Sequence, residues 1–384
     1  MKIALLLFNM GLDKPAGSCL YTRELGEALA QRGHEVYIIA DTPNKLVHLQ
    51  YAKMIQLDTE PFGSWKNCFL DANQLNDTIS VYTKALLSLD RNVNLDVVNV
   101  QHLLVSPIPA LFAKNFGKFK TIGTCHGSET HESKGNQTMT DFLKVAQKLD
   151  GFATDSETIV NDIVKMVGVG KQKINIASTG VDINKFRMDP KLYNKYRKDY
   201  DLSHEDVVVL FAGRLIEEKG VKWLPKLVKQ CQTADQKIKF FIAGDGSLKE
   251  YLGRELQLYI ENKTVVLLGA IPQEELIKYY QLSDIFILPS IWNEPFAMVS
   301  LEAMSCSLPI VVTSKGGVAQ TLIKGKLLPY ITANSYNKFY QNLMYLVRNK
   351  NIRKNFGNNL RKFIEENYSW QAVAKKFEKI YECL

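Results

Sequence analysis

Residues 289–306, with the sequence PSIWNEPFAMVSLEAMSC, decide the fold of this chain. An apolar run precedes them at residues 285–288, and another follows at residues 309–312. This alternation is typical of a strand, a turn and a helix inside a parallel α/β unit. Ligands of such units bind where strands end and helices begin, so the stretch is a candidate binding site.

Two acids of this stretch have a useful spacing. Glu294 lies in the predicted turn and Glu302 in the predicted helix. Eight residues at about 1.5 Å each allow roughly 12 Å between them. A hexose and a ribose joined by a diphosphate span a similar length, so the pair could hold both ends of a sugar nucleotide. The spacing leaves open a solvent-facing Glu294 and a surface Glu302 on an ordinary helix.

The backbone between the acids favours an anion. The amides of Phe296, Ala297 and Met298 fall at the predicted helix start, where unpaired N–H groups and the helix dipole attract negative charge. Pro295 has no N–H, but the first turn of a helix does not need one.

Length and composition indicate a two-domain globular protein. The 384 residues exceed the size that one core usually serves, and 46% hydrophobic with 23% charged residues is an ordinary globular composition. The six cysteines show no C-x-x-C spacing, so neither a disulfide framework nor a zinc site is predicted. A reducing cytoplasm fits this cysteine usage best.

The net charge of +8 lies entirely in the second half of the chain. Residues 1–190 hold 20 basic and 20 acidic side chains, which leaves 48 − 20 = 28 basic and 40 − 20 = 20 acidic ones. A basic second half suits an anionic ligand, although lysine-rich surface helices such as residues 348–362 also account for it. Basic and aromatic residues do not alternate and no nucleic-acid motif occurs, so we expect no nucleic-acid partner.

Membrane and targeting signals are weak. No apolar run approaches the length of a membrane span. Residues 3–8 imitate the start of a signal peptide, but the run is short and is followed by Asn9, Asp13 and Lys14. We therefore predict a buried first strand there. Residues 111–120 mix aromatics with lysines, as a peripheral membrane patch or a core helix with a basic end would.

The first half alternates strands with helices, which predicts a parallel sheet. Gly17 lies in a small-residue loop before the first helix, where a ligand can approach the backbone or the chain merely turns. No G-x-G-x-x-G occurs, so a dinucleotide site is not predicted. Residues 41–95 are interpreted as an irregular, partner-facing segment followed by a helix, with an amphipathic stretch at residues 75–89. The predicted strands are residues 3–8, 34–40, 96–100, 121–125, 151–154 and 174–177.

A histidine follows one of these strands directly. His126, beside Gly127, stands at the carboxyl end of residues 121–125, where a parallel sheet binds its ligand. A capping or structural histidine would also fit. His102 and His131 are less well placed, and residues 128–137 are interpreted as a polar, mobile loop.

After a hinge at residues 178–186 the pattern restarts. Arg214 and Lys219 lie between a strand end and a helix start, which favours a phosphate, because arginine can grip two oxygens and lysine adds a point charge. Lys219 could instead pair with its acidic neighbours at the surface. The predicted strands are residues 207–213, 239–244, 265–269, 285–288 and 309–313, with Gly244 opening the turn after the second, and the last helix is residues 370–381.

Together these motifs resemble the retaining glycosyltransferases of family four over nearly the whole chain. The resemblance implies a GT-B α/β architecture, in which two Rossmann-like domains face each other across a cleft and the last helix crosses back to the first domain. The implied domains are residues 1–187 with 368–384, and residues 188–367. The matching residues are Gly17, His126-Gly127, Gly180-Val181-Asp182 with Phe186, Gly213-Arg214 with Lys219, and Glu294 to Glu302.

The resemblance implies four catalytic residues. Arg214 and Lys219 would hold the donor diphosphate, Glu294 the hydroxyls of the donor sugar, and His126 the sugar near the reacting carbon. Glu302 would bind the ribose hydroxyls.

Further donor-binding residues follow from the same resemblance. Phe296 and Ala297 would offer amides to the sugar, Gly17 would leave room for phosphate and acceptor, and Ile271 would lie beside the base. The set also includes Gly213 and Gly244.

The implied reaction is retaining transfer of a hexose-type sugar from a nucleotide-diphosphate donor, UDP- or GDP-linked, to a hydroxyl of a glycan, glycolipid or small molecule. No D-x-D motif stands in a fitting place, so we expect neither a metal nor another cofactor. The expected setting is polysaccharide biosynthesis in the cytoplasm, with membrane contact at most peripheral at the inner face. A GT-B epimerase or hydrolase and a non-catalytic sugar-nucleotide binder are the alternatives. Gln320 and Lys326 depart from the family pattern, which usually has an acid and a glycine there.

Overall fold

The structure is a computed structural model, and its contacts divide the chain into two compact units. Unit 1 comprises residues 1–180 and 370–384, and unit 2 comprises residues 181–369. Residues 181–187, which the predicted first domain included, belong with unit 2. The structure describes residues 1–8, 11–12, 17–41, 47–59, 62, 67, 69, 71–292, 297–325, 327, 331–332 and 335–384.

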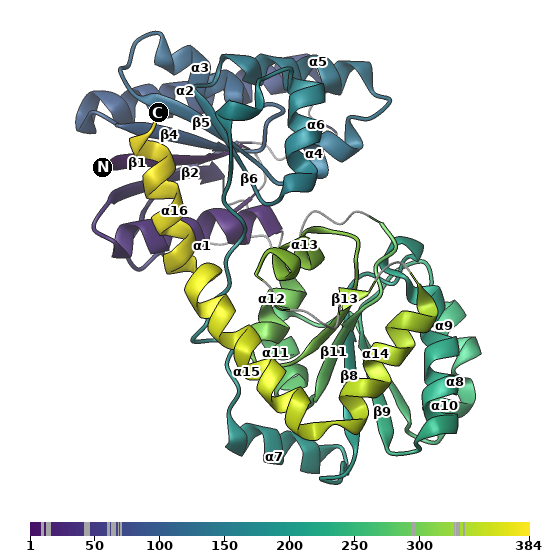
Figure 1. The fold of residues 1–384 in the computed structure, drawn as a ribbon. Helices are drawn as coiled ribbons and strands as arrows, with labels where there is room; N and C mark the ends of the chain where they lie inside the picture. The colour runs from purple at the N-terminus through teal and green to yellow at the C-terminus, as the bar shows by residue number, and fades with distance from the viewer. Residues whose placement is uncertain are drawn as a thin grey trace. The chain divides into compact units, whose positions relative to one another are not determined.

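Unit 1 is built on a seven-stranded parallel sheet with the order β3-β2-β1-β4-β5-β6-β7 (Figure 1). Its inner strands are buried almost throughout, as a sheet covered on both faces requires. The strands are β1 (Lys2–Leu7), β2 (Glu35–Asp41), β3 (Lys53–Leu57), β4 (Val97–Gln101), β5 (Lys120–Cys125), β6 (Gly151–Thr154) and β7 (Ile174–Ile176).

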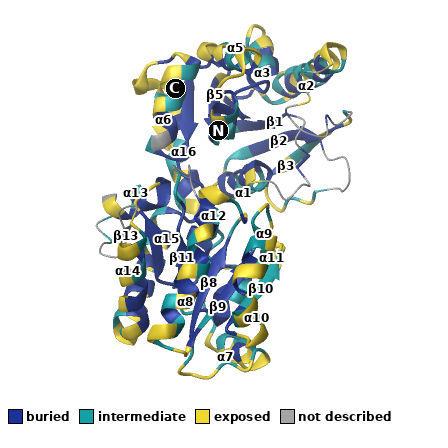
Figure 2. Ribbon diagram, turned by 90° about the vertical axis from the view of Figure 1, so that its right-hand side faces the viewer, coloured by how far each residue is buried: buried dark blue, intermediate teal, exposed yellow. Residues whose placement is uncertain are grey.

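Helices cover both faces of this sheet, and two separate apolar cores result. One core joins the sheet to α1 (Gly17–Gln31) and to α16 (Trp370–Glu382). The other joins it to helices from the middle of the unit (Figure 2). These are α2 (Ala72–Val93), α3 (Pro107–Lys114), α5 (Gln137–Val145) and α6 (Glu157–Val167).

The C-terminal helix α16 is part of unit 1, as predicted. Its Val373, Ala374 and Phe377 are fully buried in the core that it shares with α1. At its far end Glu378 accepts hydrogen bonds of 2.6 and 2.8 Å from the guanidinium of Arg32 and lies 2.9 Å from His34 Nε2. The end of the chain is therefore fixed to the start.

Unit 2 repeats the design with a six-stranded parallel sheet of order β10-β9-β8-β11-β12-β13. The strands are β8 (Val207–Ala212), β9 (Ile238–Ala243), β10 (Val265–Gly269), β11 (Ile285–Leu288), β12 (Ile310–Thr313) and β13 (Ile331–Thr332). The helices are α7 (Pro190–Asp199), α8 (Leu224–Ala234), α9 (Lys249–Glu255), α10 (Gln257–Glu261), α11 (Gln273–Leu282), α12 (Met298–Ser305), α13 (Gly317–Lys324), α14 (Tyr336–Arg348) and α15 (Lys350–Asn367).

Both sheets have the Rossmann order 3-2-1-4-5-6 in their first six strands. The strand order reverses between β1 and β4 in unit 1 and between β8 and β11 in unit 2. Ligands of such sheets bind beyond the carboxyl ends of the strands at that switch point. The topology therefore directs attention to the carboxyl ends of β1 and β4 in unit 1 and of β8 and β11 in unit 2.

Three sequence predictions are wrong in detail. Residues 41–74 are not simply irregular, because β3 pairs with β2 as an edge strand; its exposed Lys53 and Gln56 masked the strand pattern. Residues 128–137 are not a loop, because α4 (Ser128–Glu132) forms and buries Glu129 and Thr130 completely. Residues 309–313 do not hold the last strand, since β13 adds a short one.

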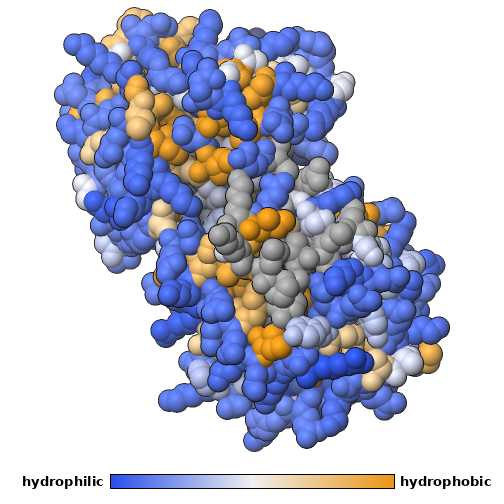
Figure 3. All heavy atoms as spheres, viewed as in Figure 1, coloured by the Kyte–Doolittle hydropathy of each residue, from blue (hydrophilic) through white to orange (hydrophobic). Residues whose placement is uncertain are grey.

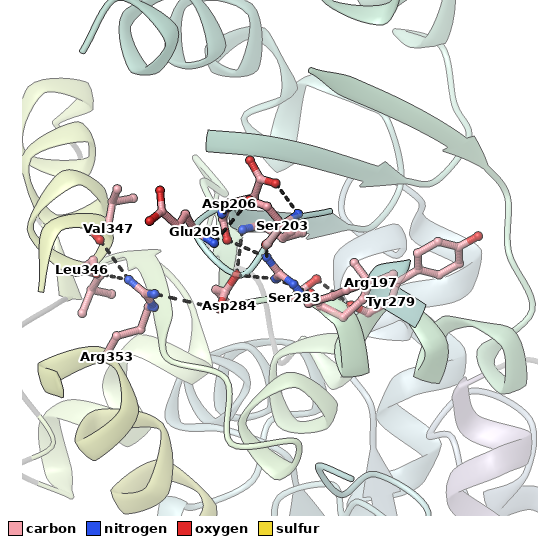
Figure 4. A network of polar contacts seen from close by, with 12 residues as sticks. Arg197, Ser203, Glu205, Asp206, Tyr279, Ser283, Asp284, Leu346, Val347 and Arg353 are labelled. Atoms are coloured by element: carbon pink, nitrogen blue, oxygen red, sulfur yellow. Dashed lines mark hydrogen bonds and ion pairs between the residues drawn. The ribbon is translucent and has the colours of Figure 1, made fainter. Parts of the chain in front are cut away.

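A buried ionic network secures unit 2 at the amino end of β11 (Figure 4). Asp284 accepts a 2.9 Å hydrogen bond from Arg197 of α7 and another from the backbone N–H of Val208. Arg197 also donates to the carbonyls of Ser203 and Asp206, each at 2.6 Å. Because ligands bind at the opposite end of the strands, this network is structural.

On the face drawn in Figure 3, hydrophilic side chains cover most of the surface and hydrophobic ones form separate patches. Within the described part of the chain, every helix is too short or too polar to cross a bilayer.

Candidate functional site

A cavity of about 380 Å³ opens at the carboxyl ends of β8, β9 and β10 in unit 2. Its size lies within the roughly 300–1,000 Å³ typical of small-molecule sites. Its lining contains four of the predicted site residues, Gly213, Arg214, Gly244 and Ile271. The complete lining is Ala212, Gly213, Arg214, Ala243, Gly244, Asp245, Ala270, Ile271, Leu276 and Val299.

Close backbone packing explains a glycine at this wall. Gly244 has a φ of +146°, and a Cβ on it would lie 1.9 Å from the carbonyl oxygen of Gly213. Its N–H donates to Gly269 O at 2.7 Å, which joins the ends of β9 and β10. A side chain here would push the strand ends apart and deform the cavity wall.

Arg214 and Lys219 sit differently in the loop after β8. Arg214 lines the cavity and is exposed, whereas Lys219 is buried and is not among the lining residues. The loop packs against the end of β11, because Gly220 approaches Pro289 so closely that a Cβ would lie 1.9 Å from its carbonyl oxygen. Ile291 N–H also donates to Glu218 O at 2.9 Å. The part of the loop that holds Lys219 thus lies beside residues 289–291.

Glu302 lies in α12 as predicted, but it is not a surface residue. Its side chain is buried, and its oxygens accept hydrogen bonds of 2.5 Å from Gln273 Nε2 and 2.8 Å from Tyr280 OH. Burial raises the pKa of Glu302, and the two hydrogen bonds with the charge of Lys185 oppose that shift. It is not among the lining residues, although Val299, one helical turn earlier, is. Each oxygen of this carboxylate thus already accepts a hydrogen bond within unit 2.

Two predicted residues, Glu294 and Phe296, lie outside the described residues. Ala297 is described and immediately precedes α12. It lines a second, much smaller cavity of about 10 Å³ with Lys315, Gly316 and Gly317 at the start of α13. That volume suits about one water molecule. Sequence reasoning did not assign these three residues, although the pair of glycines before a helix was a usable signal.

In unit 1, His126 is the centre of a polar cluster. Its Nε2 lies 3.2 Å from Gln101 Oε1, and its Nδ1 lies 3.7 Å from Asp155 Oδ2. The ring of Tyr21 meets it edge-on, with the centroids 4.7 Å apart. Burial alone would lower the pKa of His126, but pairing with Asp155 and the charge of Glu129 outweigh it and raise the pKa.

His102 is better placed than the sequence indicated. Its ring centroid lies 5.3 Å from that of His126, and its Nδ1 lies 3.4 Å from the buried Glu129. Burial lowers the pKa of His102 despite the charge of Glu129. His102 also has a φ of +78°, an uncommon backbone strain for a residue other than glycine, and such strain is concentrated at functional sites.

Gly17 is the first residue of α1 and is exposed. A Cβ on it would meet nothing within 4 Å. The space that the sequence predicted at this helix start is therefore present, but the backbone of unit 1 does not require a glycine there.

Two family models match the two units in turn. Residues 16–185 match the model described as Glycosyltransferase Family 4, and residues 193–363 match Glycosyl transferases group 1. The chain belongs to the glycosyltransferases of family four. The predicted membership of family four is confirmed, and so is the assignment as a transferase enzyme.

Similar proteins support the assignment over the full length. The glycosyltransferase is 24% identical to an uncharacterized glycosyltransferase of Methanocaldococcus jannaschii, over 100% of this chain and 98% of the relative. The structure of sucrose-phosphate synthase from Thermosynechococcus elongatus matches with a TM-score of 0.77 at 18% identity, covering 100% and 99% of the two chains. HepE of Anabaena, solved in complex with UDP-glucose, matches with a TM-score of 0.72 at 16% identity and covers 100% of both chains. The predicted GT-B α/β fold class is confirmed.

The glycosyltransferase thus carries two groups of candidate residues, one in each unit. Sequence reasoning missed Asp245, Leu276 and Val299 in the unit 2 cavity. It also missed Gln101 and Asp155 beside His126. Each of these two directly follows or ends a predicted strand, so position at a strand end was the signal that could have found them.

Proposed function

We propose that this glycosyltransferase is a retaining enzyme that transfers a hexose from a nucleotide-diphosphate sugar to a hydroxyl of a carbohydrate or lipid-linked acceptor. The observation that carries the proposal is the cavity at the carboxyl ends of β8, β9 and β10 in unit 2, which Arg214 lines. Its size and position suit the nucleotide end of such a donor. The UDP-glucose bound by HepE supports a UDP-linked donor.

The donor would lie with its base between Ile271 and Leu276, both of which line the cavity. Its diphosphate would extend toward Arg214, and Lys219 would neutralise it further after a movement of its buried side chain. The N-terminus of α12, which follows Ala297, would add backbone N–H groups. Glu302 would exchange a present hydrogen bond for the ribose hydroxyls.

Breaking the bond between the anomeric carbon and the diphosphate places negative charge on the leaving group. Arg214 and Lys219 would stabilise that charge, so the proposed mechanism needs no metal ion and no other cofactor. Retention would follow from attack of the acceptor on the face that the diphosphate leaves, with the leaving phosphate taking the acceptor's proton. His126 would donate a hydrogen bond to the donor sugar, and Glu294 would bind its hydroxyls.

Incubation with UDP- and GDP-sugars tests the proposal. Release of nucleotide that depends on an added acceptor, with the anomeric configuration of the donor kept in the product, supports retaining transfer. Release without acceptor would favour a hydrolase, and conversion of the donor into another nucleotide sugar would favour an epimerase. Binding without turnover would favour a non-catalytic binder. Undiminished turnover after chelation of divalent ions with EDTA is expected from the metal-free mechanism.

We further propose a cytoplasmic enzyme of polysaccharide biosynthesis that touches the membrane only peripherally. Phe112 and Phe116, 57% and 79% exposed, lie one helical turn apart at the end of α3, and Lys118 and Lys120 are exposed next to them. Aromatic and basic side chains together suit an anionic bilayer surface. Sedimentation with anionic liposomes that is lost in Phe112→Ser/Phe116→Ser would support this contact, and sedimentation equal to that with neutral liposomes would contradict it.

A further inference from the structure

A chain of buried hydrogen bonds runs from the C-terminal helix to His126. Asn99 Nδ2 donates to Tyr381 OH at 2.8 Å, and Gln101 Nε2 donates to Asn99 Oδ1 at 3.1 Å. Gln101 Oε1 then lies 3.2 Å from His126 Nε2. Asn99 and Gln101 are completely buried in β4, and Tyr381 belongs to α16. Residues 282 positions apart in sequence are thus joined by one bond.

In this structure the two amides of the chain point the same way, each with its NH₂ group directed toward the C-terminal helix. Asn99 Oδ1 accepts from Thr124 Oγ1 at 2.8 Å as well as from Gln101, and Asn99 Nδ2 faces the Tyr381 hydroxyl. Since Gln101 uses its NH₂ group toward Asn99, only its carbonyl oxygen is left to face His126. A carbonyl oxygen accepts and cannot donate, so His126 Nε2 must carry the proton.

The other ring nitrogen of His126 also faces an acceptor, Asp155 Oδ2 at 3.7 Å. An imidazole with an acceptor on each nitrogen is fully satisfied only when both carry protons. The remaining groups around it are Glu129 of α4, which accepts from the His126 backbone N–H at 3.2 Å, His102 after β4 and Tyr21 of α1. Asp155 and Glu129 raise the pKa of His126 against the effect of its burial, whereas burial and the charge of His126 both lower the pKa of His102.

We propose that Gln101 is a positioning residue that holds His126 as the doubly protonated imidazolium, and that Asn99, Thr124 and Tyr381 of the C-terminal helix fix the orientation of the Gln101 amide. The returning helix therefore does more than close the hydrophobic core. It supplies the far end of the hydrogen-bond chain through Tyr381. It also supplies Trp370, whose ring lies edge-on to Tyr21 with centroids 5.4 Å apart, behind the ring that contacts His126.

The consequence for catalysis rests on the proposed function. When Nδ1 of a protonated His126 exchanges its 3.7 Å contact with Asp155 for an oxygen of the sugar or the leaving group, it donates a hydrogen bond there, which a neutral ring with its only proton on Nε2 toward Gln101 cannot do. Turnover should therefore fall as the pH rises through the pKa of His126.

NMR titration of the full chain measures the pKa of His126 and so tests the inference without any substrate. The chain has six histidines, and His126→Gln identifies the ring signal that belongs to residue 126. In Gln101→Met, which keeps length but loses the acceptor, we expect the pKa of His126 to fall by about one unit. Gln101→Glu should raise it, and Tyr381→Phe should lower it by less than Gln101→Met. Tyr37→Phe, which removes a hydroxyl from another strand of the same sheet, should leave it unchanged.

An unchanged pKa of His126 in folded Gln101→Met would overturn the inference, with unchanged signals of the other histidines as the check of folding. If that variant does not fold, Tyr381→Phe and Gln101→Glu decide the question in the same way. If the pKa of His126 falls in Gln101→Met but is unchanged in Tyr381→Phe, the claim that the C-terminal helix helps to orient Gln101 is overturned.

Kinetics separates this inference from the proposed function. In Gln101→Met the high-pH fall of kcat should move to lower pH by the shift measured by NMR, with little change in donor KM. A shift in the NMR titration without one in the kcat profile would leave the hydrogen-bond chain intact and remove His126 from the reaction.

Discussion

Tyr280 OH donates a 2.8 Å hydrogen bond to Glu302 Oε2, and both side chains are buried next to the cavity of unit 2. A carboxylate in this position is costly for folding, because burial raises its pKa. Such a cost is common where a side chain is kept for binding.

We predict that Glu302→Gln stabilises the protein and weakens its binding of nucleotides. The pKa of Glu302 is higher in the folded protein than in the unfolded chain. Protonation of Glu302 therefore stabilises the fold fully below the ordinary pKa of 4.5, and this stabilisation is lost as the pH rises through the pKa of the folded protein. At pH 7 to 8 the variant should melt higher than the wild type, by about 2–4 °C for each kcal/mol that ionisation costs. Thermal melting at several pH values tests this, and the difference should vanish below pH 4.5. A lower melting temperature at pH 8, or unchanged nucleotide affinity, would contradict the prediction.

Arg214→Ala should lower turnover more than it lowers donor binding. The guanidinium stabilises charge that develops on the leaving diphosphate, and removal of such a group costs about 10²–10³ in kcat. Steady-state kinetics with the preferred donor measures both constants. Arg254→Ala, an exposed arginine of α9 that is not among the residues lining the cavity, removes the same charge from unit 2 and should behave like the wild type. Equal effects of the two substitutions would remove Arg214 from the site.

His126→Ala should abolish most of the transfer while the nucleotide still binds. The histidine belongs to unit 1, whereas the nucleotide cavity is formed within unit 2. A fall in kcat of about 10²–10³ is expected from loss of a group that contacts the reacting sugar. Calorimetric binding of UDP or GDP should stay within about twofold of wild type, since twofold is under 0.5 kcal/mol. Near-normal transfer by the variant would show that His126 is a structural residue and takes no part in the reaction.

Asp284→Asn should destabilise unit 2 without altering the cavity. The substitution leaves the buried Arg197 with an unpaired charge, and breaking one partner of a buried pair costs about 3–5 kcal/mol (Figure 4). Chemical unfolding measures the loss. Asp141→Asn, which removes an exposed partner of Lys144, is the control and should leave stability unchanged. A loss no larger than that of the control would show that the network is not structural.

The sequence was sufficient for the features that depend on continuous burial. The run Val207–Ala212 has no polar residue. Such a run is typical of a strand at the centre of a sheet that is covered on both faces. Gly213 and Arg214 then had to stand at its carboxyl end, where the structure places them on the cavity wall. The strand β3 was missed for the converse reason, because its Lys53 and Gln56 are tolerated only at a sheet edge.

Features that depend on contacts between distant residues could not be predicted. The pairing of Asn99 with Tyr381 joins β4 to the last helix, and nothing in either local pattern announces it. Glu302 was expected to be open to a ribose, but the structure buries it against Gln273 and Tyr280, which belong to a helix some 20 to 30 residues earlier. From the sequence alone, His102 received less weight than His126. Its positive φ and its position beside the ring of His126 cannot be deduced from residue spacing.

The most direct test of the account is titration calorimetry of UDP and GDP against the wild type and Val299→Phe, because Val299 lines the unit 2 cavity and a phenyl ring there would project into the space that the nucleotide needs. The account predicts that the wild type and Arg254→Ala bind at least one of these nucleotides equally well, and that folded Val299→Phe binds it at least about tenfold more weakly, a loss of about 1.4 kcal/mol. Wild-type affinity in folded Val299→Phe would contradict the claim that this cavity holds the donor.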